Sequence, residues 1–395
     1  KLRHDVGTGT LVLTDSTGQV FTFNDFGVSH PANLRGRGTG IAHAGGGSTT
    51  YAYDGSGRLA SVSRSGTVNG QTVVERVALT RHASGPNAGK VATATLARSV
   101  AGGAFVTAGS ASYAYYDGVE AHGRLGDLKT ATTFDAAGAR VSTKYQRYYT
   151  SGPFPGGLKY LVEGAQYDQY AAAVGTPFTA SDSQLGTYAN HYFEYDGAGR
   201  VTREVASGEG CSACSGGQGD FRLEYHANPK PSYRPGVNSW AMRTTETLPD
   251  GNRNVVYTNA FGQVILDVFR DTVSGQEWLT YYRYDGDGRL VLEAAPSAVT
   301  GYDECFRDLV GADQGNAPYL RDAAGVVTSY RYHTTQTGGP DGYRAGWDVR
   351  RGEFGTPVPQ QATSYVARTA GGVTTYQTAA DTVYRNSDGT GARTT

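Results

Sequence analysis

The sequence predicts an all-β protein built as an array of antiparallel β-hairpins with few short helices. Glycine supplies 56 of the 395 residues, roughly twice its usual share of about 7%, and so provides many tight turns. Tyrosine occurs 28 times and methionine once, and Thr and Val are frequent, which favours strands over helices. A nine-residue segment of strand-turn-strand character also recurs along the chain.

The charge balance excludes several classes of partner. The formal net charge is −1, and no long run of one sign occurs, so nothing favours nucleic acid or an anionic membrane surface. No stretch approaches the roughly 20 apolar residues of a membrane-spanning helix, so no membrane insertion is expected. The chain begins at Lys1 without a signal segment, which is typical of a mature product or of a piece of a longer protein.

The recurring segment reads YAYDGSGRL at Tyr51–Leu59, FEYDGAGRV at Phe193–Val201 and YRYDGDGRL at Tyr282–Leu290. In each copy the tyrosines lie on a strand, and the Asp side chain opens a turn by accepting backbone hydrogen bonds. Both glycines are expected to supply positive φ, and the Arg to pair with the Asp across the turn. The predicted turn residues are Tyr53, Asp54, Gly55, Gly57, Arg58, Tyr195, Asp196, Gly197, Gly199, Arg200, Tyr284, Asp285, Gly286, Gly288 and Arg289.

Weaker copies fill the intervals between these three. They include TFDAAGARV at Thr133–Val141, TNAFGQVIL at Thr258–Leu266 and NSDGTGART at Asn386–Thr394. A spacing of roughly twenty to thirty residues is typical of repeat arrays. The sequence therefore predicts one continuous β domain over residues 1–395, with loop insertions near 150–190 and 205–237. Short helices are expected near Leu161–Val174 and Tyr302–Val310.

The Tyr-x-Tyr-Asp-Gly-x-Gly-Arg-Leu segment resembles the YD repeat of RHS-repeat proteins. That family includes bacterial polymorphic toxins, the C components of insecticidal toxin complexes, cell-wall-associated proteins and teneurins. The resemblance covers the chain from about Leu11 to its end. It implies a long sheet of hairpins that spirals into a hollow or partial shell, with Tyr side chains stacked along the strands and the repeat turns aligned at one edge.

A search for catalytic and cofactor motifs predicts no enzyme, no catalytic residues, no metal and no cofactor. His-Glu-x-x-His and the phosphate-binding Gly-x-x-x-x-Gly-Lys motif are absent from the sequence. A calcium loop counted from Asp285 fails, because position five is Arg289 and position twelve is Pro296. Acidic pairs such as Asp267 with Asp271 are read as ordinary strand residues rather than as glycosidase carboxylates.

Three cysteines, Cys211, Cys214 and Cys305, are too few for a disulfide framework. All three are disulfide candidates, and the bridge would join Cys211 to Cys214 or one of them to Cys305. Zinc held by the cysteines with His226, a redox-active dithiol and free thiols are the alternatives.

The function expected from these features is that of an extracellular or cell-surface structural protein, adhesive and without catalytic activity. It would be the building unit of a surface filament. Both ends of the chain keep the strand-and-turn rhythm, so self-association or further repeats of the same polypeptide are the expected partners. One alternative is a shell segment of a polymorphic toxin that encloses or delivers a C-terminal toxin. Another is a carbohydrate-binding module that contacts a cell-surface glycan through Tyr and Arg side chains.

Overall fold

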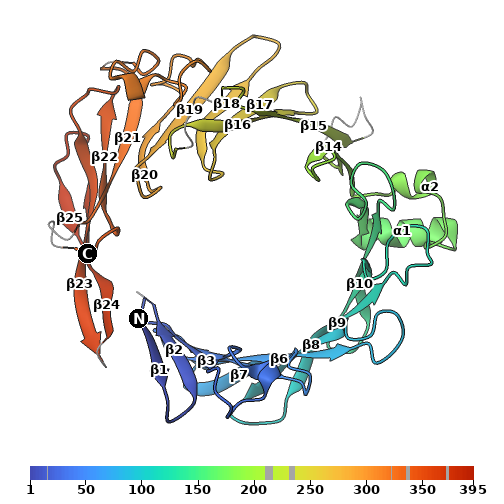
Figure 1. The fold of residues 1–395 in the computed structure, drawn as a ribbon. Helices are drawn as coiled ribbons and strands as arrows, with labels where there is room; N and C mark the ends of the chain where they lie inside the picture. The colour runs from blue at the N-terminus through green and yellow to red at the C-terminus, as the bar shows by residue number, and fades with distance from the viewer. Residues whose placement is uncertain (16, 210–216, 231–235, 322, 335–338, 371–372) are drawn as a thin grey trace. The chain divides into compact units, whose positions relative to one another are not determined.

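A computed structural model describes residues 1–395 except 16, 210–216, 231–235, 322, 335–338 and 371–372. Half of the chain, 50%, is strand and 6% is helix, so the predicted all-β class is confirmed. The strands follow one another as antiparallel hairpins (Figure 1). Residue contacts group the chain into two compact units, Lys1–Val201 with Thr369–Thr375, and Thr202–Arg368 with Tyr376–Thr395.

The first unit is a ladder in which each strand pairs antiparallel with the next one along the chain. Its strands are β1 (Leu2–Asp5), β2 (Thr10–Thr14), β3 (Val20–Asn24), β4 (Gly38–Ala42), β5 (Ser48–Tyr53), β6 (Leu59–Val68), β7 (Gln71–Arg81), β8 (Val91–Val100), β9 (Val106–Tyr115), β10 (Leu128–Phe134), β11 (Arg140–Tyr148), β12 (Leu158–Glu163) and β13 (His191–Tyr195). A short 3-10 turn, Ala32–Leu34, lies between β3 and β4.

The second unit repeats the same arrangement, with antiparallel pairing from β14 through to β23 and between β24 and β25. Its strands are β14 (Val201–Ser207), β15 (Gln218–Ala227), β16 (Trp240–Thr247), β17 (Arg253–Asn259), β18 (Val264–Arg270), β19 (Glu277–Tyr284), β20 (Leu290–Ala294), β21 (Val326–Tyr332), β22 (Arg344–Arg351), β23 (Val358–Ala370), β24 (Val373–Tyr384) and β25 (Ala392–Thr394). Residues at the start of β24 group with the first unit.

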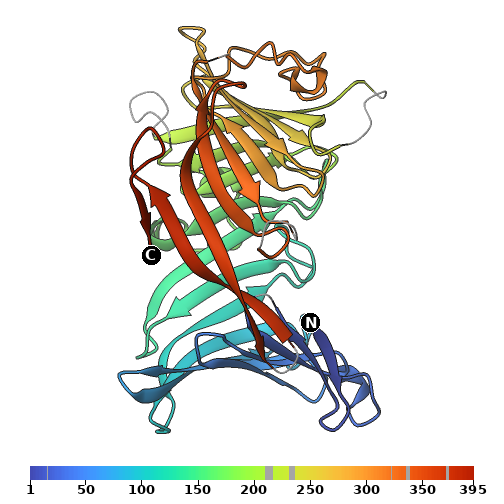
Figure 2. The same cartoon turned by 90° about the vertical axis from the view of Figure 1, so that its left-hand side faces the viewer.

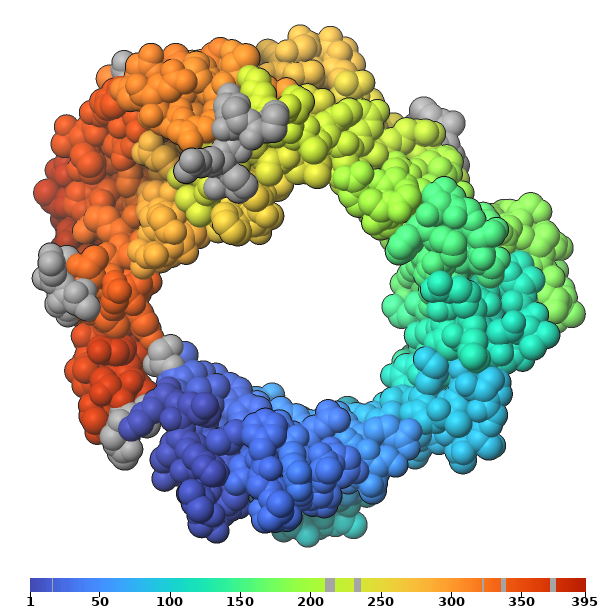
Figure 3. Space-filling model, viewed as in Figure 1, coloured from blue at the N-terminus to red at the C-terminus, as the bar shows by residue number. Residues whose placement is uncertain are grey.

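Two helices between β12 and β13 cap one face of the first unit. They are α1 (Gly164–Val174) and α2 (Asp182–Gly186). The expected helix near Leu161–Val174 is confirmed, although its first three residues belong to β12. Tyr170 and Leu185 are fully buried against strand residues Tyr145 and Val162. Figure 3 shows this helical segment, in green, standing out on the surface of the unit.

The connection 295–325, between β20 and β21, covers one face of the second unit. It supplies Val299, Leu309 and Leu320 to a core whose strand residues include Leu266 and Tyr281. This connection is orange in Figures 1 and 2. The helix expected at Tyr302–Val310 is wrong, because these residues form successive turns, and the 3-10 turn Ala312–Gln314 follows them.

The reason for the missing helix lies in competing polar contacts. The Asp303 N–H donates to the Leu309 carbonyl oxygen at 2.8 Å, across six residues. The Asp308 carboxylate accepts the Gly311 N–H at 2.8 Å and the Asp313 N–H at 2.9 Å. Leu309 has φ 70°, which no α-helix accommodates. Local side-chain acceptors therefore stabilise turns in a segment whose apolar residues had favoured a helix.

Candidate functional site

The three strict repeats fold into turns with the same hydrogen bonds. In each, the Asp Oδ1 accepts the backbone N–H groups two and four residues later, at 2.9 and 2.9 Å for Asp54, 2.9 and 3.0 Å for Asp196, and 3.0 and 2.9 Å for Asp285. The Asp N–H donates back to the Arg carbonyl oxygen at 2.8–2.9 Å. The pattern is a three-residue hairpin loop closed by a glycine bulge.

The two glycines of each repeat have different backbone conformations. Gly57, Gly199 and Gly288 have φ of 75°, 79° and 78°, in the left-handed region that favours glycine. The first glycines, Gly55, Gly197 and Gly286, do not have positive φ. The expectation that both glycines supply positive φ is therefore wrong, because the bulge needs it at a single position.

The repeat arginine closes the mouth of each turn. Its Nε donates to the Asp Oδ2 at 3.3 Å for Arg58, 2.8 Å for Arg200 and 2.7 Å for Arg289. Hydrogen bonds from the Arg58 backbone N–H lower the pKa of Asp54, and those from Arg200 do the same for Asp196. Burial alone would raise the pKa of Asp285, but the Arg289 N–H and guanidinium outweigh it, so this pKa is also lowered. All three carboxylates are thereby held ionised at neutral pH.

Seven tyrosines in the described residues make one further bond that the sequence analysis missed. Each hydroxyl donates to the backbone carbonyl oxygen of the first residue of the preceding strand, at 2.6–3.0 Å. We call this contact the tyrosine clamp. The donor–acceptor pairs are Tyr53–Gly38, Tyr115–Val91, Tyr148–Leu128 and Tyr195–Leu158 in the first unit, and Tyr284–Val264, Tyr332–Leu290 and Tyr365–Arg344 in the second.

The clamp has a simple geometric origin. Tyr53, Tyr195 and Tyr284 are each the last residue of a strand and directly precede the repeat Asp. Strand ends and the starts of their antiparallel neighbours meet at the same edge, so a long side chain there reaches the neighbour's first carbonyl. In the sequence, the tyrosine directly before each repeat Asp is the feature that could have predicted the clamp.

A polar cluster anchors the α1–α2 cap in the first unit. Arg147 is fully buried and donates to the Asp182 carboxylate at 2.8 Å and to the Tyr145 hydroxyl at 2.9 Å. The Lys159 Nζ lies 2.6 Å from the other Asp182 oxygen, and the His122 ring nitrogen lies 3.7 Å from the first. Two permanent cations and one histidine thus share a single carboxylate.

The pKa values in this cluster follow from its charges. Burial alone would raise the pKa of Asp182, but Lys159 and Arg147 outweigh it and the net direction is downward. Burial, reinforced by the Arg147 charge, lowers the pKa of His122, so this histidine is neutral at pH 7. The contacts of the cluster hold the helices against β11 and β12.

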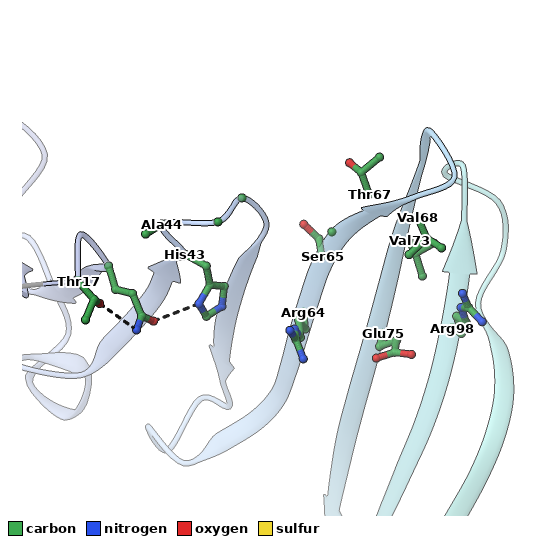
Figure 4. Close-up of a pocket in the computed structure, with 14 residues that line it drawn as sticks. Thr17, His43, Ala44, Arg64, Ser65, Thr67, Val68, Val73, Glu75 and Arg98 are labelled. Atoms are coloured by element: carbon green, nitrogen blue, oxygen red, sulfur yellow. Dashed lines mark hydrogen bonds between the residues drawn. The ribbon is translucent and has the colours of Figure 1, made fainter. Parts of the chain in front are cut away.

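An open polar cleft of about 620 Å³ lies in the first unit between the β4–β5 loop and β6–β8. Figure 4 shows Arg64, Glu75 and Arg98 side by side on the three strands, because they are direct cross-strand neighbours. Across from them, His43 contacts the Gln19 side chain at 3.2 Å. Within the described part of the chain neither arginine forms an ion pair, and no aromatic ring other than the His43 imidazole lines the cleft.

A second polar cleft, of about 670 Å³, lies entirely in the second unit. Its floor is the face of β15–β18, and its wall is the connection 295–325. Arginines from three neighbouring strands and tyrosines from the connection meet there. The lining residues are Glu224, Arg243, Thr245, Arg253, Val255, Tyr257, Arg270, Tyr302, Asp303, Glu304 and Tyr319. We call this the arginine–tyrosine cleft.

The predicted disulfide cannot be placed, since Cys211 and Cys214 lie outside the described residues. Cys305 is on the connection 295–325, where its backbone N–H donates to the Asp303 Oδ1 at 2.7 Å. The His226 ring nitrogen lies 3.7 Å from the Glu224 carboxylate. The disulfide and the zinc alternative therefore stay predictions.

Other acidic residues of the described chain do not gather into a metal site. The Asp271 carboxylate accepts the Val273 N–H at 2.8 Å and the Ser274 hydroxyl at 2.7 Å, closing the β18–β19 turn. No group of three or more His, Cys, Asp or Glu side chains suited to a metal ion occurs among the described residues. No helix in that part of the chain is long and apolar enough to cross a bilayer.

Comparison with known proteins gives weak likenesses. No protein-family model matches the chain, and no curated protein matches it. A porin-like protein from Bacteroides uniformis aligns with 12% identity over 80% of this chain and 93% of its own, with a TM-score of 0.15. A Photorhabdus luminescens Tc holotoxin pore aligns with 12% identity over 96% of this chain, with a TM-score of 0.16. This chain spans 21% of that toxin chain's length, and neither TM-score supports an assignment.

Proposed function

We propose that this chain is a non-catalytic YD-repeat scaffold that acts at the cell surface or outside the cell. The observation that carries the proposal is the use of the repeat side chains. The Tyr, Asp and Arg side chains of each strict repeat bond to the chain itself, through the clamp, the turn and the ion pair. A motif whose side chains bond chiefly to their own chain builds architecture rather than a reactive site.

The localisation part of the proposal rests on the YD-repeat resemblance. Its test is fractionation of cells that carry the gene, with immunoblots of cytosol, protease-accessible surface and medium. We expect the protein in the surface or released fraction, and loss of the surface signal after protease shaving. A protein confined to the cytosol, and protected from protease, would overturn the extracellular assignment.

The assembly part of the proposal is self-association or continuation into further repeats of the same polypeptide. Sedimentation velocity and negative-stain electron microscopy of the intact gene product separate the outcomes. Filaments or a longer repeat array support the proposal, whereas a discrete monomer with no additional repeats contradicts it. A closed particle with enclosed density would instead favour the alternative of a toxin shell, which the same resemblance implies.

A further inference from the structure

The arginine–tyrosine cleft contains an arrangement of charge that strand pairing does not require. Arg253 on β17 is directly opposite Arg270 on β18, and like charges in this position destabilise a sheet. Arg270 is neutralised by Glu277, with its Nε 2.6 Å from the carboxylate. Within the described residues Arg253, which is exposed, has no ion-pair partner, so its guanidinium remains available.

The third arginine of the cleft, Arg243, is already paired with Glu304. The Arg243 guanidinium donates to the Glu304 carboxylate at 2.6 Å, and the Tyr257 hydroxyl donates to the same carboxylate oxygen at 2.9 Å. These contacts fix the connection 295–325 against β16 and β17. The cleft wall is therefore held in place before any ligand arrives, which reduces the ordering cost of binding.

Tyrosine rings form the remaining recognition surface. Tyr302 is half-buried and meets the Tyr257 ring edge-to-face, with centroids 5.5 Å apart. Tyr319 is also half-buried and meets Phe306 edge-to-face at 6.2 Å. Rings anchored in this way present rigid, amphipathic area at little entropic cost. Thr245 and Glu224, which also line the cleft, offer a hydroxyl and a carboxylate to polar ligand groups.

We propose that the arginine–tyrosine cleft binds an acidic saccharide. Arg253 takes the carboxylate, because a guanidinium presents a fork of donors that matches it. Tyr302 or Tyr319 packs against the sugar ring, and Thr245 and Glu224 bond its hydroxyls. The first-unit cleft has arginines but no tyrosine, so it lacks the ring contact. This inference adds a ligand to the proposed scaffold and does not depend on its localisation or assembly.

The test is calorimetric titration of the full chain with tetragalacturonate and with its methyl ester, which has the same sugar rings without the charge. We expect the acid to bind roughly tenfold or more tightly than the ester, the gain typical of a hydrogen bond to a charged group. Arg253→Gln should remove that difference, Arg253→Lys should keep part of it, and Tyr302→Leu should weaken both ligands. Thermal melts establish that each variant is folded.

The matched control is Arg98→Gln, which removes an exposed strand arginine from the cleft of Figure 4. It should leave both affinities unchanged. Equal affinity for acid and ester, no binding by the wild type, or loss of binding in Arg98→Gln with retention in Arg253→Gln would each overturn the proposal. None of these results bears on whether the repeats form an extracellular scaffold, so the two proposals fail separately.

Discussion

Gly57 has φ 75° in the fourth position of its turn, and a Cβ added there would lie 2.5 Å from the Asn33 carbonyl oxygen. Gly55, two residues earlier in the same turn, lacks positive φ and has open space where its Cβ would be. The turn thus offers a matched pair of substitutions. A side chain at Gly57 meets both backbone strain and a steric clash, whereas a side chain at Gly55 meets neither.

We expect Gly57→Ala to lower the free energy of unfolding by about 1–3 kcal/mol, the cost of an L-residue in a disfavoured backbone region with a clash. Gly55→Ala should change it by less than about 1 kcal/mol, in the stabilising direction if anything, because alanine restricts the unfolded chain. Urea unfolding of the two variants and the wild type measures this. Equal midpoints for the two variants would contradict the assignment of the bulge to Gly57.

The tyrosine clamp offers a second comparison between neighbours. Tyr284 donates its hydroxyl to the Val264 carbonyl oxygen at 2.7 Å, whereas Tyr282, half-buried on the same strand, makes no such clamp. Tyr284→Phe should cost about 1 kcal/mol, the usual net value of one hydrogen bond, and Tyr282→Phe should cost less. Chemical denaturation decides between them, and a larger loss in Tyr282→Phe would argue against the clamp.

At the scale of elements, the hairpins follow closely from local sequence. The Asp at the start of a repeat and the Gly three residues later determine the turn without help from distant residues, which is why the strands around Asp54, Asp196 and Asp285 are predictable. The helix α1 is also predictable. The connection 295–325 is not, since its course over the sheet depends on burying residues such as Leu309 and Leu320 against a sheet face.

The clefts also cannot be predicted from the sequence, because they depend on contacts between residues that are distant in the chain. Arg243 and Glu304 are 61 residues apart in the chain, and nothing in the local sequence around either predicts their meeting. Likewise, the sequence shows the tyrosine before a repeat Asp. It does not show which carbonyl oxygen accepts the tyrosine hydroxyl, because strand register determines that. Local turn chemistry can be read from a sequence, while contacts that depend on long-range pairing cannot.

The α1–α2 cap provides a prediction about an element. Asp182 neutralises the buried Arg147 and the half-buried Lys159, so Asp182→Ala leaves two cations without their carboxylate. Removing one partner of a buried pair costs about 3–5 kcal/mol, and the partial exposure of Asp182 lowers our expectation to roughly 2 kcal/mol. The control is Asp168→Ala on α1, since its bond to Arg140 at 2.8 Å is between exposed side chains and is worth about 0–1 kcal/mol.

The two variants are compared by thermal melts and by hydrogen exchange of residues 164–190. Faster exchange confined to this segment in Asp182→Ala is the expected signature of a loosened cap. If Asp168→Ala loosened it as much, the buried cluster would not be what holds the helices.

The same cap should weaken in acid. The pKa of His122 is lowered by burial and by Arg147, so the unfolded chain binds this proton more readily than the folded one. Unfolding free energy therefore falls as the pH drops below the unfolded value of about 6.5. The lowered pKa of Asp182 gives a second loss below about pH 4, where the carboxylate is protonated in the unfolded chain first.

Melting temperature measured from pH 8 to pH 3 should thus fall in two stages, and His122→Gln should remove the first. Lys159, Arg147 and Asp182 are the charged groups that face His122. None of these three titrates between pH 5 and 7, so the first stage belongs to His122. A single-stage profile in the wild type, or an unchanged first stage in His122→Gln, would show that the histidine is not coupled to stability.

At the scale of the whole molecule, most of the buried hydrophobic residues that the structure describes fall into two clusters. One, in the second unit, includes Leu266 and Tyr281, and the other, in the first unit, includes Tyr145 and Leu185. Long repeat proteins commonly depart from all-or-none unfolding, because each element contacts chiefly its neighbours. The two clusters therefore provide a test of how far cooperativity extends along this chain.

Leu266 and Leu185 are both fully buried, so Leu266→Ala and Leu185→Ala are equivalent cavity-forming changes in different units. Each should cost about 2–5 kcal/mol in its own unit. Native-state hydrogen exchange should show faster opening of β16–β21 in Leu266→Ala and of β11, β12 and α1 in Leu185→Ala, because local opening is confined to contiguous cooperative segments. A uniform rise across all strands in either variant would mean that the chain unfolds as a single unit despite its two cores.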